Sequence, residues 1–340
     1  MGSRSRAIEV RELQGDEYGL WDRLAEDSPQ GTVFHRGSWL RTCSEALGRK
    51  LSIYGCFDKD RLRGGCSLFT YKLKGTFRAA TSTPLLTPYG GVLVTQSPST
   101  RVREQEEEYS DILKSLIDEL ERQPFDLIRM VNSPSLVDIR PFSQRGWLSK
   151  TYYSYYYDLG PEIEDSISKE VRNTARKAVK LGVSVERTCD LPGFYRLFKM
   201  TYERQGMKPP ATEAYFERLL NVLRSEKVGD MWLATTATGE LAAAEIFAWD
   251  SKRSYRWSAA SHTELRQTGA TSMLLREVLR DLRAAGFREV DLMAASTKHL
   301  AKFISSFNPR LVPLYSVERK SILLGLAERI YRSIRRRRTR

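Results

Sequence analysis

Apolar and polar residues along the chain form a series of short segments that occurs twice. In the first half, alternation of apolar and polar residues predicts strands, and a 3.6-residue period predicts helices. We expect strands at 8–13, 50–58, 61–73, 125–131 and 146–159, an extended segment at 83–94, and helices at 15–29, 37–48 and 104–122.

The second half restarts the same kind of pattern at residue 183. The pattern predicts a strand, two helices, three strands, a helix, a strand, a helix and a last strand, ending near residue 317. Strands and helices alternate late but not early, which is typical of an α+β domain with a mixed sheet. We therefore divide the chain into domains at 1–160 and 183–318, a connecting helix at 161–182 and a tail at 319–340.

The connecting helix has a strongly basic face. On a helical wheel Lys169, Arg172, Arg176 and Lys180 fall in one stripe, opposite an apolar side. Asp165 or Ser166 suits the start of this helix, and Gly182 suits its end. Such a stripe is either a solvated face or a surface that binds phosphates or carboxylates.

Composition narrows the class of protein. The chain has 340 residues and a formal charge of +13, of which residues 319–340 carry nine Lys or Arg and one Glu. The basic charge is thus mainly a property of the tail. No segment has the roughly 20 apolar residues of a membrane span, and the first residues have no apolar signal core. Four cysteines without a CxxC pair and three distant histidines predict no metal site and a reduced, cytoplasmic protein.

Several segments, in order, resemble the FemAB family of acyltransferases, which are built from two tandem GNAT-like domains. The matching segments are "GTVFHRGSW", "TPYGGVLV", "YYYDLG" followed by "KEVRNTARKAVK", "AAGFREVDLMA" and "LAKFISSF". The resemblance covers about residues 15–318. It implies an α+β fold with mixed central sheets, and transfer of an aminoacyl or acetyl group from aminoacyl-tRNA or acyl-CoA to an amine of a cell-envelope or polysaccharide precursor.

The resemblance also implies site residues. Arg172 and Arg176 of the basic helix would bind an anionic group, and Tyr89, Gly90, Gly91 and Phe303 would contact the acceptor. In "RQTGAT", Arg266, Gly269 and Thr271 match part of the loop that binds the donor pyrophosphate, where backbone N–H groups and a helix N-terminus face phosphates. The alternatives are a plain turn with a packed tyrosine at Tyr89 and an ordinary helix start at Gly269.

The chain departs from the family in its closing helix. The family usually has Phe-Lys there, with the lysine at the acyl-transfer centre, whereas this chain has Phe303-Ile304 and a lysine at 302. Either Lys302 substitutes or the aminoacyl-tRNA chemistry is absent. The departure also supports an alternative function, a non-catalytic FemAB-like protein that binds an anionic ligand in its inter-domain cleft.

Glu245 is the candidate general base. It is the only acid in the apolar run "AAAEIFAW", and burial would raise the pKa of a carboxyl toward neutrality. Two alternatives remain: Glu245 faces water or pairs with an arginine, or the substrate itself carries the proton.

The tail is predicted to form an accessory amphipathic helix. Leu323, Leu326, Ala327, Ile330, Tyr331 and Ile334 follow one helical face, and arginines crowd its end. This pattern favours a peripheral contact with the inner face of the membrane, near a lipid-linked acceptor. The helix could instead pack on the second domain, or its arginines could contact tRNA.

Overall fold

The computed structural model describes residues 8–73, 76–160, 163–204, 206–293, 295 and 297–338, without the side chains of His299 and of 331–338. The chain divides into two compact units. Unit 1 comprises residues 1–151 and 314–340, and unit 2 comprises residues 152–313. The predicted second domain, 183–318, thus differs from unit 2 at both ends, and the tail belongs to unit 1.

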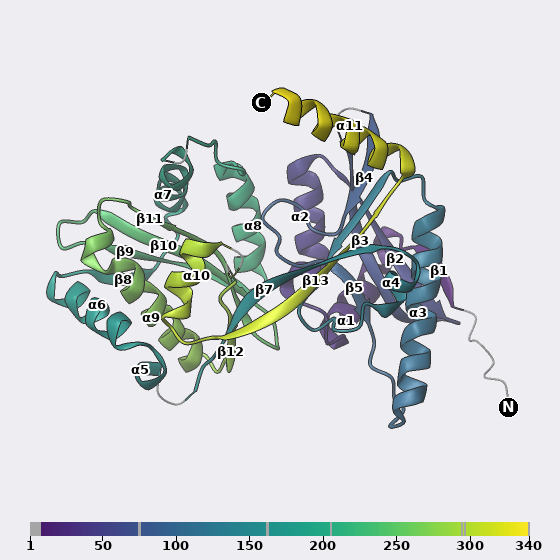
Figure 1. The fold of residues 1–340 in the computed structure, drawn as a ribbon. Helices are drawn as coiled ribbons and strands as arrows, with labels where there is room; N and C mark the ends of the chain where they lie inside the picture. The colour runs from purple at the N-terminus through teal and green to yellow at the C-terminus, as the bar shows by residue number, and fades with distance from the viewer. Residues whose placement is uncertain are drawn as a thin grey trace. The chain divides into compact units, whose positions relative to one another are not determined.

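Unit 1 is built on a mixed sheet with the strand order β1-β2-β3-β4-β6-β13 (Figure 1). Its strands are β1 (Glu9–Glu12), β2 (Lys50–Asp58), β3 (Arg61–Leu73), β4 (Phe77–Thr81), β5 (Gly91–Val94), β6 (Leu127–Val131) and the end of β13 (Arg310–Lys320). β4 and β5 pair with successive parts of β3, and β4 runs parallel to β6. All other pairs in the order are antiparallel.

The helices of unit 1 each place buried apolar side chains in the core of the unit. They are α1 (Tyr18–Asp27), α2 (Gly37–Leu47), α3 (Val102–Arg122), α4 (Arg140–Gln144) and α11 (Ile322–Arg338), with short 3-10 turns η1 (Gly15–Glu17) and η2 (Val33–His35). In α3 the spacing of Ile112, Leu113, Leu116 and Leu120 is helical, and all four side chains are buried in one core with sheet residues such as Cys66 and Met130.

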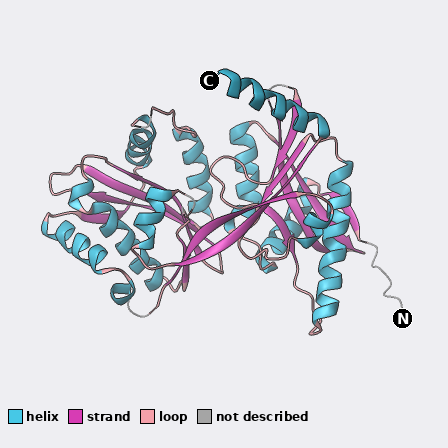
Figure 2. Cartoon of the chain, viewed as in Figure 1, coloured by secondary structure: helices cyan, strands magenta, loops and turns pink. Residues whose placement is uncertain are grey.

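Unit 2 combines helices and strands (Figure 2), and its part of the mixed sheet has the order β7-β12-β11-β10-β9-β8. The strands are β7 (Leu148–Asp158), which begins in unit 1, β8 (Ser184–Arg187), β9 (Gly229–Thr235), β10 (Leu241–Trp249), β11 (Ser254–Ser261) and β12 (Glu289–Asp291). Only β11 and β12 are parallel among these pairs. Their pairing ends at Tyr255 and Asp291, where β12 itself ends, whereas β11 continues to Ser261.

Two groups of helices pack on the sheet of unit 2. α5 (Ile163–Ser166), α6 (Lys169–Lys180), α9 (Ala270–Ala284) and α10 (Lys298–Ser305) share a core with Trp232 and Phe247. α7 (Leu191–Glu203) and α8 (Glu213–Ser225) carry an aromatic cluster in which Phe216 contacts Trp257. The turn η3 (Arg266–Thr268) leads into α9.

The basic helix begins later than the sequence pattern indicated. Ser168, rather than Asp165 or Ser166, caps α6, because its hydroxyl accepts a hydrogen bond from the Val171 amide at 3.2 Å. Residues 163–166 instead form the separate turn α5. Gly182 follows the helix with φ +69°, as expected for a glycine that ends a helix.

No helix within the described part of the chain is both long enough and apolar enough to cross a bilayer.

Candidate functional site

The loop from β11 to α9 in unit 2 is packed against the basic helix. Gly269 ends η3 and precedes α9 with φ +78°. A Cβ atom at residue 269 would lie 2.5 Å from the carbonyl oxygen of Thr174 on α6. Because that separation is shorter than any ordinary contact and the φ angle disfavours a side chain, glycine is required here. The loop and α6 are therefore fixed to each other within unit 2.

The first turn of α9 has the charge pattern of an anion-binding helix start. It contains no acidic residue, and Gly269 at its N-cap has no side chain with which to cap the helix. The Thr268 hydroxyl accepts a hydrogen bond from the Ala270 amide at 3.3 Å. The unsatisfied N–H groups and the dipole of a 15-residue helix produce a positive end that favours phosphate or carboxylate. Thr271 lies in this first turn and is half-buried.

Two arginines add to this positive end. The pKa of Arg266 is lowered from its ordinary value, first by desolvation and second by the positive charge of Arg204. Arg204, at the end of α7, donates a hydrogen bond to the Thr263 hydroxyl at 3.4 Å, which holds it beside the loop. Two like charges this close disfavour each other unless an anion lies near both. The sequence pattern identified Arg266, but not Arg204, which lies in a distant segment.

His262, at the end of β11, was also missed by the sequence analysis. Its backbone amide donates to the Ala242 carbonyl at 2.8 Å, which fixes its position at the edge of the sheet. The ring is half-buried, and its buried Nδ1 has no hydrogen-bond partner among the described residues. An imidazole nitrogen in this state is available to accept or donate a proton.

Glu245 is buried but paired. Arg256 on β11 donates from Nε to Oε2 at 2.9 Å and from Nη2 to Oε1 at 2.6 Å, and both side chains are almost fully buried. This bidentate pair gives each carboxylate oxygen a hydrogen-bond donor. The sequence left open that Glu245 pairs with an arginine, and the structure has this pair. We therefore do not include Glu245 among the proton-transfer groups.

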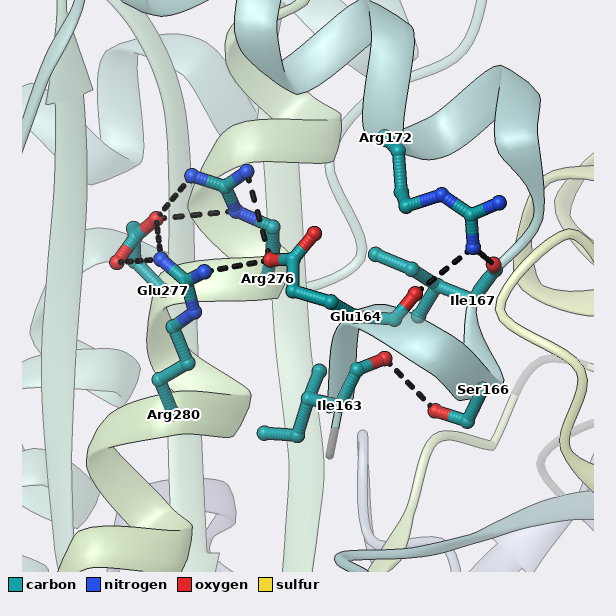
Figure 3. Close-up of polar contacts among 8 residues, drawn as sticks. All are labelled: Ile163, Glu164, Ser166, Ile167, Arg172, Arg276, Glu277 and Arg280. Atoms are coloured by element: carbon teal, nitrogen blue, oxygen red, sulfur yellow. Dashed lines mark hydrogen bonds and ion pairs between the residues drawn. The ribbon is translucent and has the colours of Figure 1, made fainter. Parts of the chain in front are cut away.

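Arg172 binds the protein's own backbone. Its Nη1 donates to the carbonyl oxygens of Glu164 at 2.8 Å and Ile167 at 2.7 Å (Figure 3). Glu164 lies within the four-residue helix α5 and Ile167 just beyond it, and the last four carbonyl oxygens of a helix lack helical partners. Arg176, one turn further along α6, is exposed. The two arginines thus lie on one helix but in different environments.

A charged network holds α5 on α9, also within unit 2. Arg280 donates to the Glu164 carboxylate at 2.5 Å, and the buried Arg276 lies 3.6 Å from the same oxygen (Figure 3). Glu277 accepts hydrogen bonds from both arginines, at 2.6 Å and 3.1 Å. Because α5 leads directly into α6, this network and Arg172 together position the basic helix beside the start of α9.

The closing helix α10 presents Lys302 to solvent. Lys302 is exposed, Phe303 is half-buried with its ring centroid 5.5 Å from that of Phe307, and Ile304 is fully buried in the core of unit 2. The isoleucine at position 304 is therefore a packing residue. The lysine at 302 remains the nearest basic residue to it on α10.

Tyr89, Gly90 and Gly91 lie in the core of unit 1. Tyr89 is 3% exposed. A Cβ at Gly90 would lie 2.2 Å from the Ser82 carbonyl oxygen, and one at Gly91 would lie 2.2 Å from the side-chain oxygen of Asn132. Close packing around the backbone explains these glycines. This arrangement agrees with a plain turn with a packed tyrosine, which the sequence left open as the alternative to a segment that contacts the acceptor.

Unit 1 has a cavity of about 650 Å³ between the end of β5, α3 and residues 135–140. Gln30 lines it, with its side-chain oxygen fixed by the Val94 amide at 3.1 Å. Arg63 pairs with Glu108 at 3.4 Å, and Arg140 pairs with Asp138 at 2.8 Å. Because its charges compensate one another, this cavity is less suited to a phosphate than the start of α9, and it contains none of the predicted site residues.

Residues 165–299, which include α6, Arg204, His262 and the loop to α9, match the model of the acetyltransferase (GNAT) domain family. No curated protein matches the chain.

Solved structures match almost the whole chain, at low sequence identity. FemX is 14% identical, with a TM-score of 0.68 over 90% of this chain and 96% of its own. A tandem GNAT protein from the clavulanic acid biosynthesis pathway is 14% identical, with a TM-score of 0.55 over 92% of this chain and 98% of its own. The L-PGS of Bacillus licheniformis is 10% identical, with a TM-score of 0.55 over 93% and 96%.

These matches confirm the predicted fold, two tandem GNAT-like domains with mixed sheets. Residues 165–299 thus match a GNAT acetyltransferase domain, and the chain has the fold of FemX over 90% of its length.

Proposed function

We propose that the chain is an N-acyltransferase whose acyl-CoA donor binds at the loop between β11 and α9. One observation carries the choice of donor: Arg204 and Arg266 converge beside a helix start that has no acidic residue. A pyrophosphate provides the two negative charges that this arrangement favours. Aminoacyl-tRNA, which also has a phosphate backbone, is the second candidate donor.

The reaction follows from the donor. The amine nitrogen of the acceptor attacks the thioester carbonyl carbon, an N–C bond forms, the C–S bond breaks, and the thiolate leaves to become the free thiol of CoA. The nitrogen must lose a proton on the way, so a nearby proton acceptor accelerates the reaction. We propose His262 for this role, because its Nδ1 has no partner among the described residues and it directly precedes the donor loop.

The acceptor is proposed from the relatives. FemX and L-PGS share the fold, and we propose an amine of a cell-envelope or polysaccharide precursor, with Arg176 and Lys302 as exposed cations for its anionic groups. Since CoA esters and charged tRNA are made in the cytoplasm, we place the reaction there. A protein that binds the anionic ligand without turnover is the remaining alternative, and the substitution at Ile304 favours it.

Calorimetry tests the donor site. Wild type, Arg204→Gln with Arg266→Gln, and the control Arg283→Gln are each titrated with acetyl-CoA. Arg283 is an exposed arginine at the far end of α9. We expect the double variant to bind about tenfold more weakly or worse, because two charge-assisted contacts are lost. Equal affinity of all three proteins would refute the site, and binding of charged tRNA alone would select the second donor.

Thiol release with a panel of amine acceptors tests catalysis. The dependence of kcat/KM on pH should differ in shape between wild type and His262→Gln, because the variant lacks the imidazole that would accept the proton. A variant profile parallel to that of wild type would assign the proton to the substrate.

Lys302→Ala should lower kcat more than it raises KM if the lysine acts in the transition state.

A further inference from the structure

The C-terminal helix α11 exposes a row of apolar residues. Ile322, Leu323, Leu326 and Ile330 are 83%, 69%, 49% and 61% exposed. At about 100° per residue, the four side chains occupy one arc of about 100° on the helix. Ala327 lies beside this arc, whereas Tyr331 and Ile334, which the sequence analysis assigned to the same face, have side chains outside the described residues.

A different face attaches the helix to unit 1. Leu324 is 2% exposed and packs with Ala79 and Leu127 of the sheet. Ser321 starts the helix: its hydroxyl accepts from the Leu324 amide at 3.2 Å and donates to Asp126 at 2.9 Å. Glu328, one turn beyond Leu324, pairs with Lys320 at 3.0 Å. The attachment therefore accounts for Leu324 and leaves the exposed row without a structural role in unit 1.

The charge that accompanies the row is positive. Residues 329–340 contain seven arginines and no acidic residue. Upstream, Glu328 is already paired with Lys320. An exposed apolar row beside a strongly basic segment matches a surface that has both acyl chains and negative headgroups. Nucleic acid would use the arginines, but it would leave Ile322 and Leu323 exposed to water.

We propose that α11 lies on anionic lipid bilayers, with the row Ile322, Leu323, Leu326 and Ile330 inserted among the lipids and the arginines at the headgroups. This proposal is independent of the donor and acceptor of the reaction. It predicts a peripheral, salt-sensitive contact that needs the apolar row as well as the charge.

Vesicle co-sedimentation of the full chain tests the proposal. The vesicles contain phosphatidylcholine alone or phosphatidylcholine with about one-third phosphatidylglycerol, at low and moderate salt. The test variant is Leu323→Ser, Leu326→Ser and Ile330→Ser, which keeps every charge and leaves Leu324 in place. Shortening the chain at Ser316 is unsuitable, because Ser316–Lys320 pair with β6.

A matched control removes exposed apolar residues elsewhere. Val179 and Leu181 at the end of α6 are 53% and 47% exposed. We expect wild type and Val179→Ser with Leu181→Ser to bind the anionic vesicles equally, and the triple serine variant to bind about tenfold more weakly or worse. Binding of each protein to vesicles of phosphatidylcholine alone should be weaker than the binding of wild type to the anionic vesicles.

Three results would overturn the proposal. Wild type that ignores anionic vesicles at low salt has no lipid contact. A triple serine variant that binds as well as wild type shows attraction by charge alone. Binding of tRNA that depends on Arg335, Arg336, Arg337 and Arg338, with no vesicle binding, makes the tail a nucleic-acid segment. The same variants are also titrated with acetyl-CoA, and their affinity for it should be unchanged. This titration separates the test of lipid binding from the test of the proposed function.

Discussion

A methyl group on residue 269 would lie 2.5 Å from the carbonyl oxygen of Thr174. This close approach joins the loop before α9 to the basic helix α6, and it has a direct consequence. Gly269→Ala must adopt φ near +78° and also move α6 away. The angle alone costs about 1–2 kcal/mol, and the displacement adds to it.

The matched control for this change is Gly239→Ala, where φ is +80° but no atom lies within 4 Å of the new methyl group. Both variants should lose stability in chemical denaturation, and Gly269→Ala should lose clearly more. Only Gly269→Ala should also weaken acetyl-CoA binding. Equal losses in the two variants would mean that the contact with Thr174 relaxes without cost.

The buried pair of Glu245 and Arg256 should be a stability element. Glu245→Gln leaves the Arg256 charge buried without its partner, and removing one member of a buried pair costs about 3–5 kcal/mol. The double change Glu245→Met with Arg256→Met should recover much of that loss, because no charge stays buried. Denaturation curves and thiol-release rates are measured on the same samples. A Glu245→Gln protein of normal stability but without turnover would restore the glutamate as the base.

Position 304 should not accept a lysine, the residue that the family resemblance predicts there. Ile304 is 0% exposed in the core of unit 2, so Ile304→Lys places a charge there without a partner, at a cost of several kcal/mol. Ile304→Leu, the volume-matched control, should cost less than about 1.5 kcal/mol. Thermal unfolding distinguishes them. An Ile304→Lys protein as stable as wild type would show that α10 turns this residue to solvent.

Acid should weaken the junction of β13 and α11. Partial burial alone would raise the pKa of Glu318, but hydrogen bonds from Lys320 and Arg129 outweigh it and lower that pKa. A carboxyl with a lowered pKa in the folded state stabilises the protein above its unfolded pKa, about 4.3, and this contribution disappears as pH falls through the folded pKa.

The pH test compares wild type with Glu318→Gln. Wild type should be the more stable at pH 7, and its advantage should shrink in unfolding experiments below about pH 4. Glu217→Gln, at an exposed residue of α8, is the control and should track wild type at both pH values. An advantage of wild type over Glu318→Gln that stays constant down to pH 2 would contradict the role of Glu318.

The hydrophobic pattern was sufficient for most of the fold. β2 and β3 occupy the predicted ranges, 50–58 and 61–73, because each has a turn signal on either side and a strong apolar run. β4 was missed. Its residues Ala79, Ala80 and Thr81 are all buried, so this strand shows no alternation of apolar and polar residues from which it could be recognised.

The site was less predictable, since it depends on distances between remote segments. Arg204 gains its significance only from the end of α7 lying beside Thr263, which no periodicity encodes. His262 stands four residues before Arg266, and inspection of that short loop for titratable groups would have identified it. The position of Arg172 on the basic face suggested an arginine that binds a ligand. In the structure its guanidinium instead donates hydrogen bonds to the carbonyl oxygens of Glu164 and Ile167.

Unit 1 is discontinuous, because residues 314–340 return to it after the whole of unit 2. During synthesis, strand β6 is made early, yet its partner in β13, Ser316–Lys320, emerges almost two hundred residues later. Until then one edge of the nascent sheet is open to other chains. Unit 2, which is contiguous, has all its residues before that edge is closed. We therefore expect the half of the protein that is translated first to complete its folding last, and to be the part that most needs protection on the ribosome.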